Sequence, residues 1–509
     1  MTEYTNIPQY PEPYWRDSVK LEGYPKLDKT IDTDVGIVGG GITGITAAYL
    51  LAKQNVRVVL IDAGEVLNGT TGHTTAKITA QHGLIYNELI EHFGEEKASM
   101  YYKANLEALE FITKMIKKHD IDCDFKKEDA FLFTNSDSYL SKLELEDKAY
   151  SRLKIPGEMV QNMPLNLSMK SAIVMKDQAQ YHPLKYLKAL LNDAVKNGAQ
   201  VFENTTATDI EYNKHPAIIT RDGQRVTCRY VIQASHYPFY DGQGFYPTRM
   251  YADRSYVLAI KSDKQYPGGM YINAEDPTRS IRSTTNNGED LWLIGGDSHK
   301  TGQGKPTIEH YNALEEFAKR EIGITEYANR WSAQDLITLD KVPYIGPTTA
   351  KQESVFVATG FRKWGMTNGT LAARMITDSI LNGSNEYQEL FSPSRFQADP
   401  SVRKFSSINA DVAKHLIKGK LEYTNDIVSD LKVDEATITR IDGNRAGVYK
   451  DKQEKLYMVD TTCTHLGCEV EWNSGDRTWD CPCHGSRFSY TGDVIEGPAK
   501  KPLKKIKND

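Results

Sequence analysis

The sequence predicts an α/β chain, α+β overall, in which a Rossmann-like domain interleaved with an antiparallel-sheet cap precedes a small all-β domain. A short apolar strand, a glycine-rich turn and an Ala/Leu-rich helix follow one another over residues 34–54. Alternating apolar and polar residues occupy parts of the middle, as in Arg249 to Lys261, and this alternation is typical of antiparallel strands. Short strands with glycine turns end the chain of 509 residues, which is long enough for two or three domains.

The glycine-rich turn has the form of a dinucleotide-binding motif. The strand Asp34 to Val38 runs into Gly-Gly-Gly-Ile-Thr-Gly. In such a motif the first glycine permits the tight turn, the second lets the backbone approach a pyrophosphate, and the third lets helix and strand pack closely. A second strand, Val56 to Ile61, ends at an acidic residue that can bind ribose hydroxyls. The expected nucleotide-binding residues are Gly39, Gly41, Thr43, Gly44 and Asp62.

The segment that follows resembles the flavin-approach segment of the D-amino acid oxidase and glycine oxidase class of FAD oxidoreductases. It supplies small residues and hydroxyls over Gly69 to Lys77. Farther along, Val355 to Gly369 is a strand, a glycine-rich turn and the start of a helix. This stretch is similar to the closing flavin motif of that class, and an ordinary strand-to-helix turn is the alternative. The residues that the resemblance implies at FAD are Thr70, Thr71, His73, Thr74, Thr75, Lys77, Gly360, Gly365, Met366 and Thr367.

The same resemblance covers about Thr33 to Arg395 and implies the domain organisation. The substrate cap is expected to be inserted into the FAD-binding domain in two stretches. A polar stretch broken by Pro400 indicates a linker, in which Ile408 to Leu421 has the pattern of a helix that docks the last domain. The expected bounds are 1–395 for the oxidoreductase (FAD-binding parts at about 33–85, 195–238 and 326–395, cap at about 86–194 and 239–325), 396–427 for the linker and 428–509 for the last domain.

Two short loops near the end of the chain carry soft metal ligands. They read Cys463-Thr-His465-Leu-Gly-Cys468 and Cys481-Pro-Cys483-His484-Gly-Ser486. Two thiolates and two imidazoles suit a two-iron two-sulfur centre with cysteine on one iron and histidine on the other. A structural zinc site also takes two cysteines and two histidines, but zinc explains four of these residues and leaves two cysteines without a role.

The pattern resembles the Rieske proteins of cytochrome bc complexes, from near Val428 to the end. That family has an aromatic hydroxyl two residues after its cluster-bonding serine, and this chain has Phe488 there. Since hydrogen bonds to the sulfurs help to set the potential, we expect a midpoint within the Rieske span of about −150 to +300 mV but below its top. The implied ligands are Cys463, His465, Cys481 and His484, the implied disulfide joins Cys468 and Cys483, and the implied donor to the cluster is Ser486.

Composition excludes some classes of protein. A formal net charge of −6 argues against a nucleic-acid binder, because phosphate contacts need a basic face. We expect no transmembrane segment and a cytoplasmic location, since no run approaches the roughly eighteen apolar residues that cross a bilayer and the start of the chain lacks the apolar core of a secretion signal. Cytosolic disulfides are rare, which opposes the implied bridge unless burial over the cluster protects it. Cys123 and Cys228 are expected to be buried, inert thiols.

The two redox groups together predict the function. A flavin accepts two electrons as a hydride and releases them singly, whereas a Rieske cluster carries one at a time. We therefore expect a flavin-dependent oxidoreductase that oxidises an amine or amino acid by hydride transfer to FAD and passes electrons through the cluster to an unidentified one-electron acceptor. A non-catalytic electron-transfer subunit or a redox sensor is the alternative. A ferredoxin reductase would need a second nucleotide fold, and a Rieske oxygenase would need a mononuclear iron triad.

Substrate contacts are expected on the cap. Guanidinium forks match carboxylates, although an arginine on a strand is more often a surface charge or a member of an ion pair. We assign no catalytic base, because hydride transfer from a neutral amine does not require one. The candidate substrate contacts are Arg254, Arg282, Tyr251, Tyr256 and His299.

Overall fold

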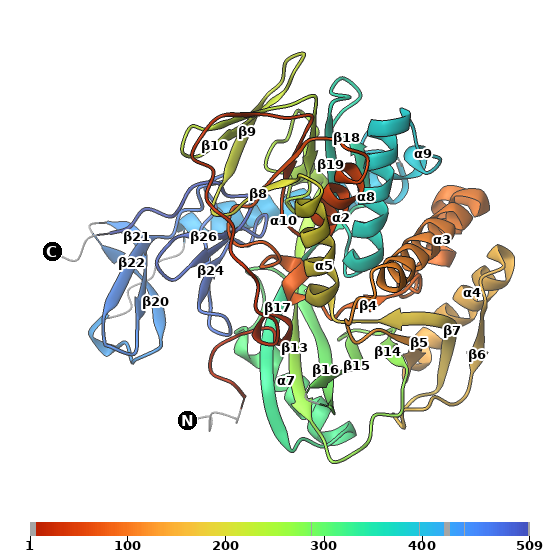
Figure 1. Cartoon of the computed structure of the whole chain (residues 1–509). Helices are drawn as coiled ribbons and strands as arrows, with labels where there is room; N and C mark the ends of the chain where they lie inside the picture. Colours follow the sequence, from red (N-terminus) through yellow and green to blue (C-terminus); the bar gives the residue numbers. More distant parts are fainter. Residues whose placement is uncertain (1–6, 287, 397, 422–427, 442, 507–509) are drawn as a thin grey trace.

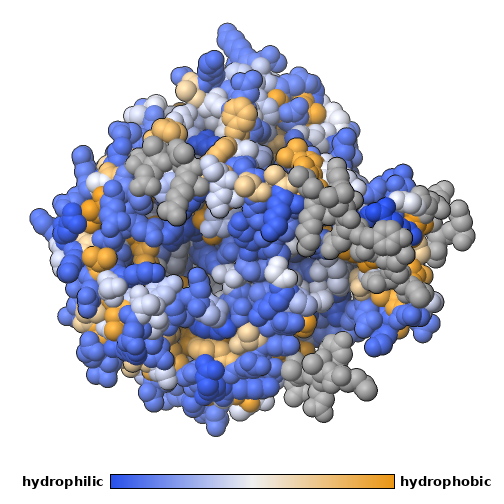
Figure 2. Space-filling view, turned by 180° about the vertical axis from the view of Figure 1, so that it is seen from behind, coloured by the Kyte–Doolittle hydropathy of each residue, from blue (hydrophilic) through white to orange (hydrophobic). Residues whose placement is uncertain are grey.

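A computed structural model describes residues 7–286, 288–396, 398–421, 428–441 and 443–506. The chain forms a larger body, against one side of which the C-terminal strands pack (Figure 1). On the face seen in Figure 2, hydrophilic residues predominate and apolar residues form small scattered groups. Among the described residues, no helix combines the length and the apolar character that a bilayer crossing requires.

The first layer of the body is a six-stranded sheet in the order β18-β19-β12-β2-β3-β8. All neighbours are parallel except β18 and β19. Its strands are continuous apolar runs, as expected of a parallel sheet covered on both faces, and the helix after β2 packs between two others. The strands are β2 (Val35–Val38), β3 (Val58–Ile61), β8 (Gln200–Phe202), β12 (Tyr230–Gln233), β18 (Tyr344–Pro347) and β19 (Val355–Thr359), and the three helices are α2 (Ile42–Ala52), α5 (Pro183–Lys196) and α8 (Gly365–Asn382).

The second layer is a largely antiparallel sheet of nine strands, which provides the expected cap. Its order is β17-β13-β16-β15-β14-β5-β7-β4, and β6 pairs with β7. The strands are β4 (Lys77–Ile78), β5 (Lys126–Thr134), β6 (Gly157–Val160), β7 (Ser171–Gln180), β13 (Met250–Lys261), β14 (Met270–Asn273), β15 (Arg279–Asn286), β16 (Glu289–Lys300) and β17 (Glu326–Thr338). The helices that accompany it are α3 (Tyr86–Lys118), α4 (Asp137–Leu153) and α7 (Ile308–Glu321).

Strand β17 belongs to this sheet, although residues 326–395 were expected in the FAD-binding part. It pairs with β13 along its whole length. The nine-stranded sheet therefore gains an edge strand from the polypeptide that leads directly to the closing flavin motif. Strands β13 and β17 lie next to the C-terminal domain on one face and border a cavity on the other.

The C-terminal domain is all-β, as expected, and consists of two small antiparallel sheets. Trp479 is fully buried in its core, and a Cβ atom on Gly447 would lie 2.6 Å from the Trp479 ring. Helix α10 (Ala398–Leu421) precedes this domain, and its Val412 and Leu416 pack against the domain core. The strands are β20 (Ala436–Ile441), β21 (Asn444–Lys450), β22 (Leu456–Asp460), β23 (Glu471–Asn473), β24 (Thr478–Asp480), β25 (Arg487–Ser489) and β26 (Val494–Glu496).

Short elements complete the chain. A four-stranded sheet has the order β1-β11-β10-β9. The remaining elements are α1 (Tyr14–Asp17), β1 (Ile31–Asp32), η1 (Thr70–His73), β9 (Ala207–Glu211), β10 (Ala217–Thr220), β11 (Arg225–Thr227), α6 (Tyr246–Arg249), α9 (Gln388–Phe391) and η2 (Val428–Asp430).

Candidate functional site

The turn between β2 and α2 has the geometry of a phosphate cradle. Gly39 has a φ of +111°, and a Cβ atom on Gly44 would lie 1.9 Å from the Gly39 carbonyl oxygen, so both positions require glycine. Helix α2 begins at Ile42, and its N-cap residue Gly41 offers no side chain to cap the free amides. The Thr71 hydroxyl accepts a hydrogen bond from the Ile42 amide at 3.1 Å. An N-terminus of this kind attracts anions through its free amides and helix dipole.

Asp62 lies at the end of β3 beside this turn. Its two carboxylate oxygens accept hydrogen bonds from the Gly40 amide at 2.7 Å and the Gly64 amide at 2.9 Å. Burial raises the pKa of Asp62, and the two amides oppose that rise. The structure therefore brings Asp62 next to the glycine turn, where the sequence motif needs an acid.

The backbone of the segment Thr70 to Lys77 is held by large buried side chains. Trp331 donates from Nε1 to the His73 carbonyl at 2.8 Å, and Trp15 donates to the Thr74 carbonyl at 2.6 Å. Arg282 donates from Nη1 to the carbonyls of Thr75 and Ala76 at 2.8 and 2.7 Å. Arg282, expected to contact substrate, therefore binds the backbone of the flavin-approach segment.

The two titratable residues of this segment, His73 and Lys77, are both half-buried. Burial, followed by repulsion from Arg282, lowers the pKa of Lys77 to about 7. Its Nζ donates to the Tyr271 carbonyl at 3.3 Å. Burial also lowers the pKa of His73, whose Nδ1 lies 2.9 Å from the Gly69 carbonyl. Desolvation thus shifts both side chains toward their neutral forms.

The second glycine-rich turn joins β19 to α8 and meets the first. Gly360 has a φ of +76°, and α8 begins at Gly365 without a side-chain cap. The Thr43 hydroxyl donates to the Gly369 carbonyl at 3.1 Å, which ties the two motifs together. Two further expected residues are engaged by neighbours: Met366 accepts a hydrogen bond from Tyr181 at 3.2 Å, and the Thr367 hydroxyl lies 3.2 Å from His82 Nε2.

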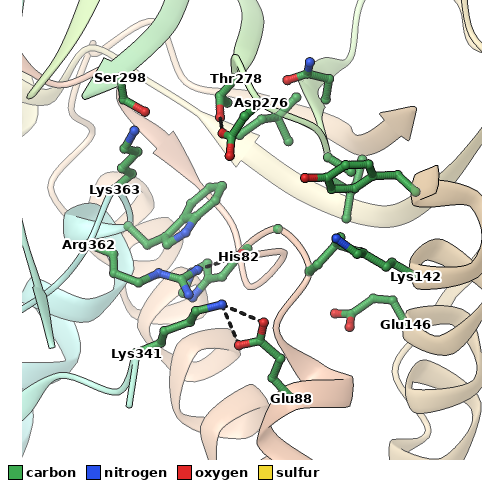
Figure 3. A pocket seen from close by; sticks show the side chains of 18 of the residues that line it. His82, Glu88, Lys142, Glu146, Asp276, Thr278, Ser298, Lys341, Arg362 and Lys363 are labelled. Carbon is green, nitrogen blue, oxygen red and sulfur yellow. Dashed lines mark hydrogen bonds and ion pairs between the residues drawn. The ribbon is translucent and has the colours of Figure 1, made fainter. Parts of the chain in front are cut away.

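A cavity of about 820 Å³ opens where this second turn meets α3, α4 and β14 (Figure 3). His82 and Trp364 stack on one of its walls, with ring centroids 4.8 Å apart. Arg362 donates to the His82 carbonyl at 2.6 Å. Neither His82 nor Arg362 was predicted as a site residue: Arg362 lies within the closing flavin motif, whereas no sequence motif contains His82.

Carboxylates and lysines share the rest of this cavity. Lys341 pairs with Glu88, and Lys363 pairs with Asp253 at 3.1 Å. Glu146 accepts three hydrogen bonds from backbone amides at the start of α3, which satisfy its oxygens. Burial nevertheless raises the pKa of Glu146 to about 6.

The five candidate substrate contacts do not gather at this cavity. Tyr251 lines it. Because side chains alternate along a strand, Arg254 and Tyr256 lie on the opposite face of β13 from Asp253. Tyr256 bonds to His299 Nε2 at 2.9 Å and stacks on it. Arg254 is fully buried and lies 3.5 Å from Asp480 and 3.4 Å from Glu496 of the C-terminal domain. The structure places Arg254, Tyr256 and His299 away from the cavity.

The two cluster loops bring the four candidate ligands together. Cys463 and Cys481 are buried free thiols. The rings of His465 and His484 lie 5.0 Å apart, and the buried Nδ1 atom of each lacks a hydrogen-bond partner in the described part of the chain. Burial lowers the pKa of both imidazoles to about 4. Two thiols and two unpartnered neutral imidazole nitrogens fit the donor set of a Rieske cluster.

A disulfide and a hydroxyl lie beside these ligands. The disulfide joins Cys468 and Cys483, and the sulfur atoms of both lie within 4.8 Å of the Cys481 sulfur. Contact with Cys481 lowers the pKa of the Cys463 thiol, and the Ser486 hydroxyl acts in the same direction. Ser486 Oγ also accepts a hydrogen bond from the Ala499 amide at 3.0 Å. This contact leaves the Ser486 proton available to a cluster ligand.

The cluster loops pack directly on the sheet that borders the cavity. Gln334 of β17 donates from Nε2 to the Gly485 carbonyl at 2.9 Å, and Gln303 donates to the Pro482 carbonyl at 3.1 Å. The Tyr237 ring lies 6.4 Å from the His465 ring. Strands β13 and β17 thus contribute one face to the cavity and the other face to the cluster domain.

Comparisons with known proteins agree with both regions. The family model described as FAD dependent oxidoreductase matches residues 34–379, and the model of the Rieske [2Fe-2S] domain matches residues 423–507. Members of the first family bind FAD, and the Rieske domain binds a [2Fe-2S] cluster.

Individual relatives cover most of the chain. A putative Rieske 2Fe-2S iron-sulfur protein, YhfW of Bacillus subtilis, is 50% identical over 499 residues, 98% of both chains. Gamma-glutamylputrescine oxidoreductase of Escherichia coli is 25% identical over 423 residues, 77% of this chain and 92% of that protein. The crystal structure of glycine oxidase from Geobacillus kaustophilus shares the fold with a TM-score of 0.62 at 17% identity, over 72% of this chain and all of that one. The chain therefore belongs to the FAD dependent oxidoreductase family and carries a C-terminal Rieske [2Fe-2S] domain.

Proposed function

We propose that this enzyme oxidises an amine or an amino acid at the cavity in front of α3 and α4. In this proposal the electrons pass singly through the C-terminal domain to an external one-electron acceptor. The observation that carries it is the shared sheet: Tyr251 and Asp253 of β13 line the cavity, while Gln334 of the adjoining β17 binds the cluster loop. The cavity and the cluster loop therefore lie on opposite faces of the same sheet.

The proposed cofactor sites follow from the geometry. FAD would be held by the uncapped α2 and α8 termini, by Asp62 and by the Thr70 to Lys77 segment. The cluster would be held by Cys463, His465, Cys481 and His484, with Ser486 as hydrogen-bond donor. When bound, a flavin takes up a hydride and yields electrons singly, which matches the one-electron capacity of a two-iron cluster.

Protein side chains would hold the substrate and shield the reaction. The His82 and Trp364 stack forms a rigid wall. The ion pairs of Lys341 with Glu88 and Lys363 with Asp253 neutralise charges that would otherwise hold water in the cavity. The names of the relatives, gamma-glutamylputrescine oxidoreductase and glycine oxidase, support an amine or amino acid as substrate. We also propose that residues 1–395 and 428–509 are the functional units.

An anaerobic experiment tests the proposal. The protein with both cofactors is mixed without oxygen with D- and L-amino acids, glycine derivatives and polyamines. A substrate bleaches the flavin absorbance, and the electron paramagnetic resonance signal of a reduced Rieske cluster then appears. Bleaching without the cluster signal would refute the electron route. Failure of every compound to bleach the flavin, in protein whose cluster dithionite reduces, would refute the amine or amino acid oxidase function.

A further inference from the structure

Two carboxylates lie opposite each other on the cavity side of the shared sheet. Asp253 of β13 and Asp335 of β17 are direct partners in the antiparallel ladder, so their side chains project from the same face. The next pair on that face is Tyr251 and Ile337, and both of these line the cavity, as does Asp253. Asp335 therefore projects from the face of the sheet that contributes these three residues to the cavity.

This pair also adjoins the closing flavin motif. The Arg362 amide donates to the Leu336 carbonyl at 3.0 Å, and Phe361 forms a bridge with Ile337. On the other side of Asp335 along β17, Trp331 holds the His73 carbonyl of the flavin-approach segment. Asp335 thus lies between the two backbone segments proposed to hold the flavin.

The two carboxylates differ in their partners. Asp253 forms an ion pair with Lys363. Asp335 is only 9% exposed, yet within the described residues its carboxylate has no hydrogen-bond donor and no ion-pair partner. A buried carboxylate without a partner is costly. Lys363 pairs with Asp253 and forms no ion pair with Asp335, so the Asp335 carboxylate can accept a second cation.

We propose that Asp335 binds the cationic nitrogen of the incoming substrate, which loses a proton to solvent before hydride transfer. The substrate class is therefore alkyl amines, including polyamines, instead of compounds recognised through an α-carboxylate. This assignment rests on the proposed function and deepens it. Asp253 acts as a positioning residue, since it fixes Lys363 and keeps that lysine from neutralising Asp335 completely.

Most cations near Asp335 are engaged elsewhere, which argues against a carboxylate clamp there. Lys142 of α4, which also lines the cavity, lies over the Tyr139 ring. Arg254 points to the cluster domain, and Arg282 binds backbone carbonyls. Arg362 donates to the His82 carbonyl. Lys341 and Lys363 each have a carboxylate partner.

Binding of two probes of the same shape and opposite charge tests the assignment. tert-Butylammonium has no hydrogen on the carbon next to nitrogen, so it cannot be dehydrogenated, and pivalate replaces its nitrogen by a carboxylate. Binding to the oxidised protein with both cofactors is followed by the change in flavin absorbance. We expect saturable binding of tert-butylammonium and none of pivalate at the same concentration. Equal or tighter binding of pivalate would overturn the assignment.

Variants connect this binding to Asp335. Asp335→Asn should weaken tert-butylammonium about 10- to 100-fold, as loss of a hydrogen bond to a charged group implies, and Asp335→Glu should restore part of the affinity. The control is Asp177→Asn, which removes the same charge from an exposed side chain in a weak pair with Lys127. Unchanged affinity in Asp335→Asn protein that retains its flavin would overturn the assignment.

Flavin bleaching separates this inference from the proposed function. If amino acids bleach the flavin anaerobically and amines without a carboxylate do not, the oxidase function stands and the role of Asp335 is wrong. If tert-butylammonium binds through Asp335 but no amine or amino acid bleaches the flavin, the amine site stands and the oxidase function is wrong.

Discussion

The side-chain amide of Gln334 donates a 2.9 Å hydrogen bond to the backbone carbonyl of Gly485, in the second cluster loop. The backbone carbonyl of the same glutamine lies 3.4 Å from the Thr70 hydroxyl, in the flavin-approach segment. One residue of β17 therefore contacts the loops proposed to hold the two redox groups. A Cβ atom on Gly485 would lie 2.4 Å from the Ala252 Cβ, so the second cluster loop packs against β13 at a distance that only glycine permits.

Replacement of Gln334 should loosen the contact between the two regions. Gln334→Leu leaves the buried Gly485 carbonyl without its donor, which costs about 1–3 kcal/mol. We expect substrate to bleach the flavin at nearly the wild-type rate, while the cluster signal appears more slowly in freeze-quenched anaerobic samples. Gln352→Leu is the matched control, because the Gln352 amide donates to Tyr240 and not to a cluster loop. Equal slowing in both variants would contradict the assigned role.

Arg254 should hold the cluster domain against the sheet. It is fully buried and faces Asp480, Glu496 and Asp476, and the last of these also pairs with Arg487 at 2.6 Å. Arg254→Gln leaves buried carboxylates undercompensated, and removal of one member of such a network costs about 3–5 kcal/mol. In small-angle scattering, the Arg254→Gln protein should have a larger radius of gyration than the wild type. In a urea titration, the C-terminal domain should separate from the sheet at a lower urea concentration. Arg225→Gln, at an exposed pair with Glu211, should change stability by about 0–1 kcal/mol.

Local sequence patterns predicted groups of residues that the structure brings together, because the members of each group are close in the chain. The glycine turn, Asp62 and the two cluster loops each depend on spacing within one strand, turn or loop, and the structure brings the expected residues of each group together. The mixed fold with its antiparallel cap and all-β C-terminal domain was predicted for the same reason.

The remaining features depend on contacts between distant segments. Alternation along β13 separates Tyr251 from Arg254, but it does not reveal which face meets the cavity and which meets a domain more than two hundred residues later. Arg254 therefore resembled a carboxylate clamp in the sequence, although its partners are carboxylates of the protein itself. No sequence pattern marked Asp335 as a binding residue, because the role proposed for it depends on the lack of a partner for its carboxylate within the folded, described chain.

Hydrogen bonding at the cluster should set its potential in a predictable direction. Ser486→Ala removes the hydroxyl beside Cys463, and loss of a charge-assisted hydrogen bond corresponds to a fall of about 60 to 130 mV for a one-electron couple. Phe488 is fully buried, and Phe488→Tyr places a hydroxyl where related Rieske proteins carry one, so the potential should rise. Redox titration followed by electron paramagnetic resonance measures both shifts. Ser489→Ala, whose hydroxyl lies 2.7 Å from that of Thr491, is the control. A rise in potential in Ser486→Ala would show that the serine has another role.

Amine binding should strengthen as pH rises through neutrality. Burial raises the pKa of Asp335 to about 7; Lys363 and Arg254 oppose this rise, whereas Asp253 and Glu496 add to it. Below pH 7 the carboxyl group is protonated and neutral, and above it the group carries the charge that attracts an ammonium. An alkyl amine stays cationic to about pH 10, as lysine does. The affinity for tert-butylammonium should therefore increase between pH 6 and 8 and then level off, and this dependence should be absent in Asp335→Asn. Affinity that falls over this range in the wild type would show that a group other than the Asp335 carboxylate governs binding.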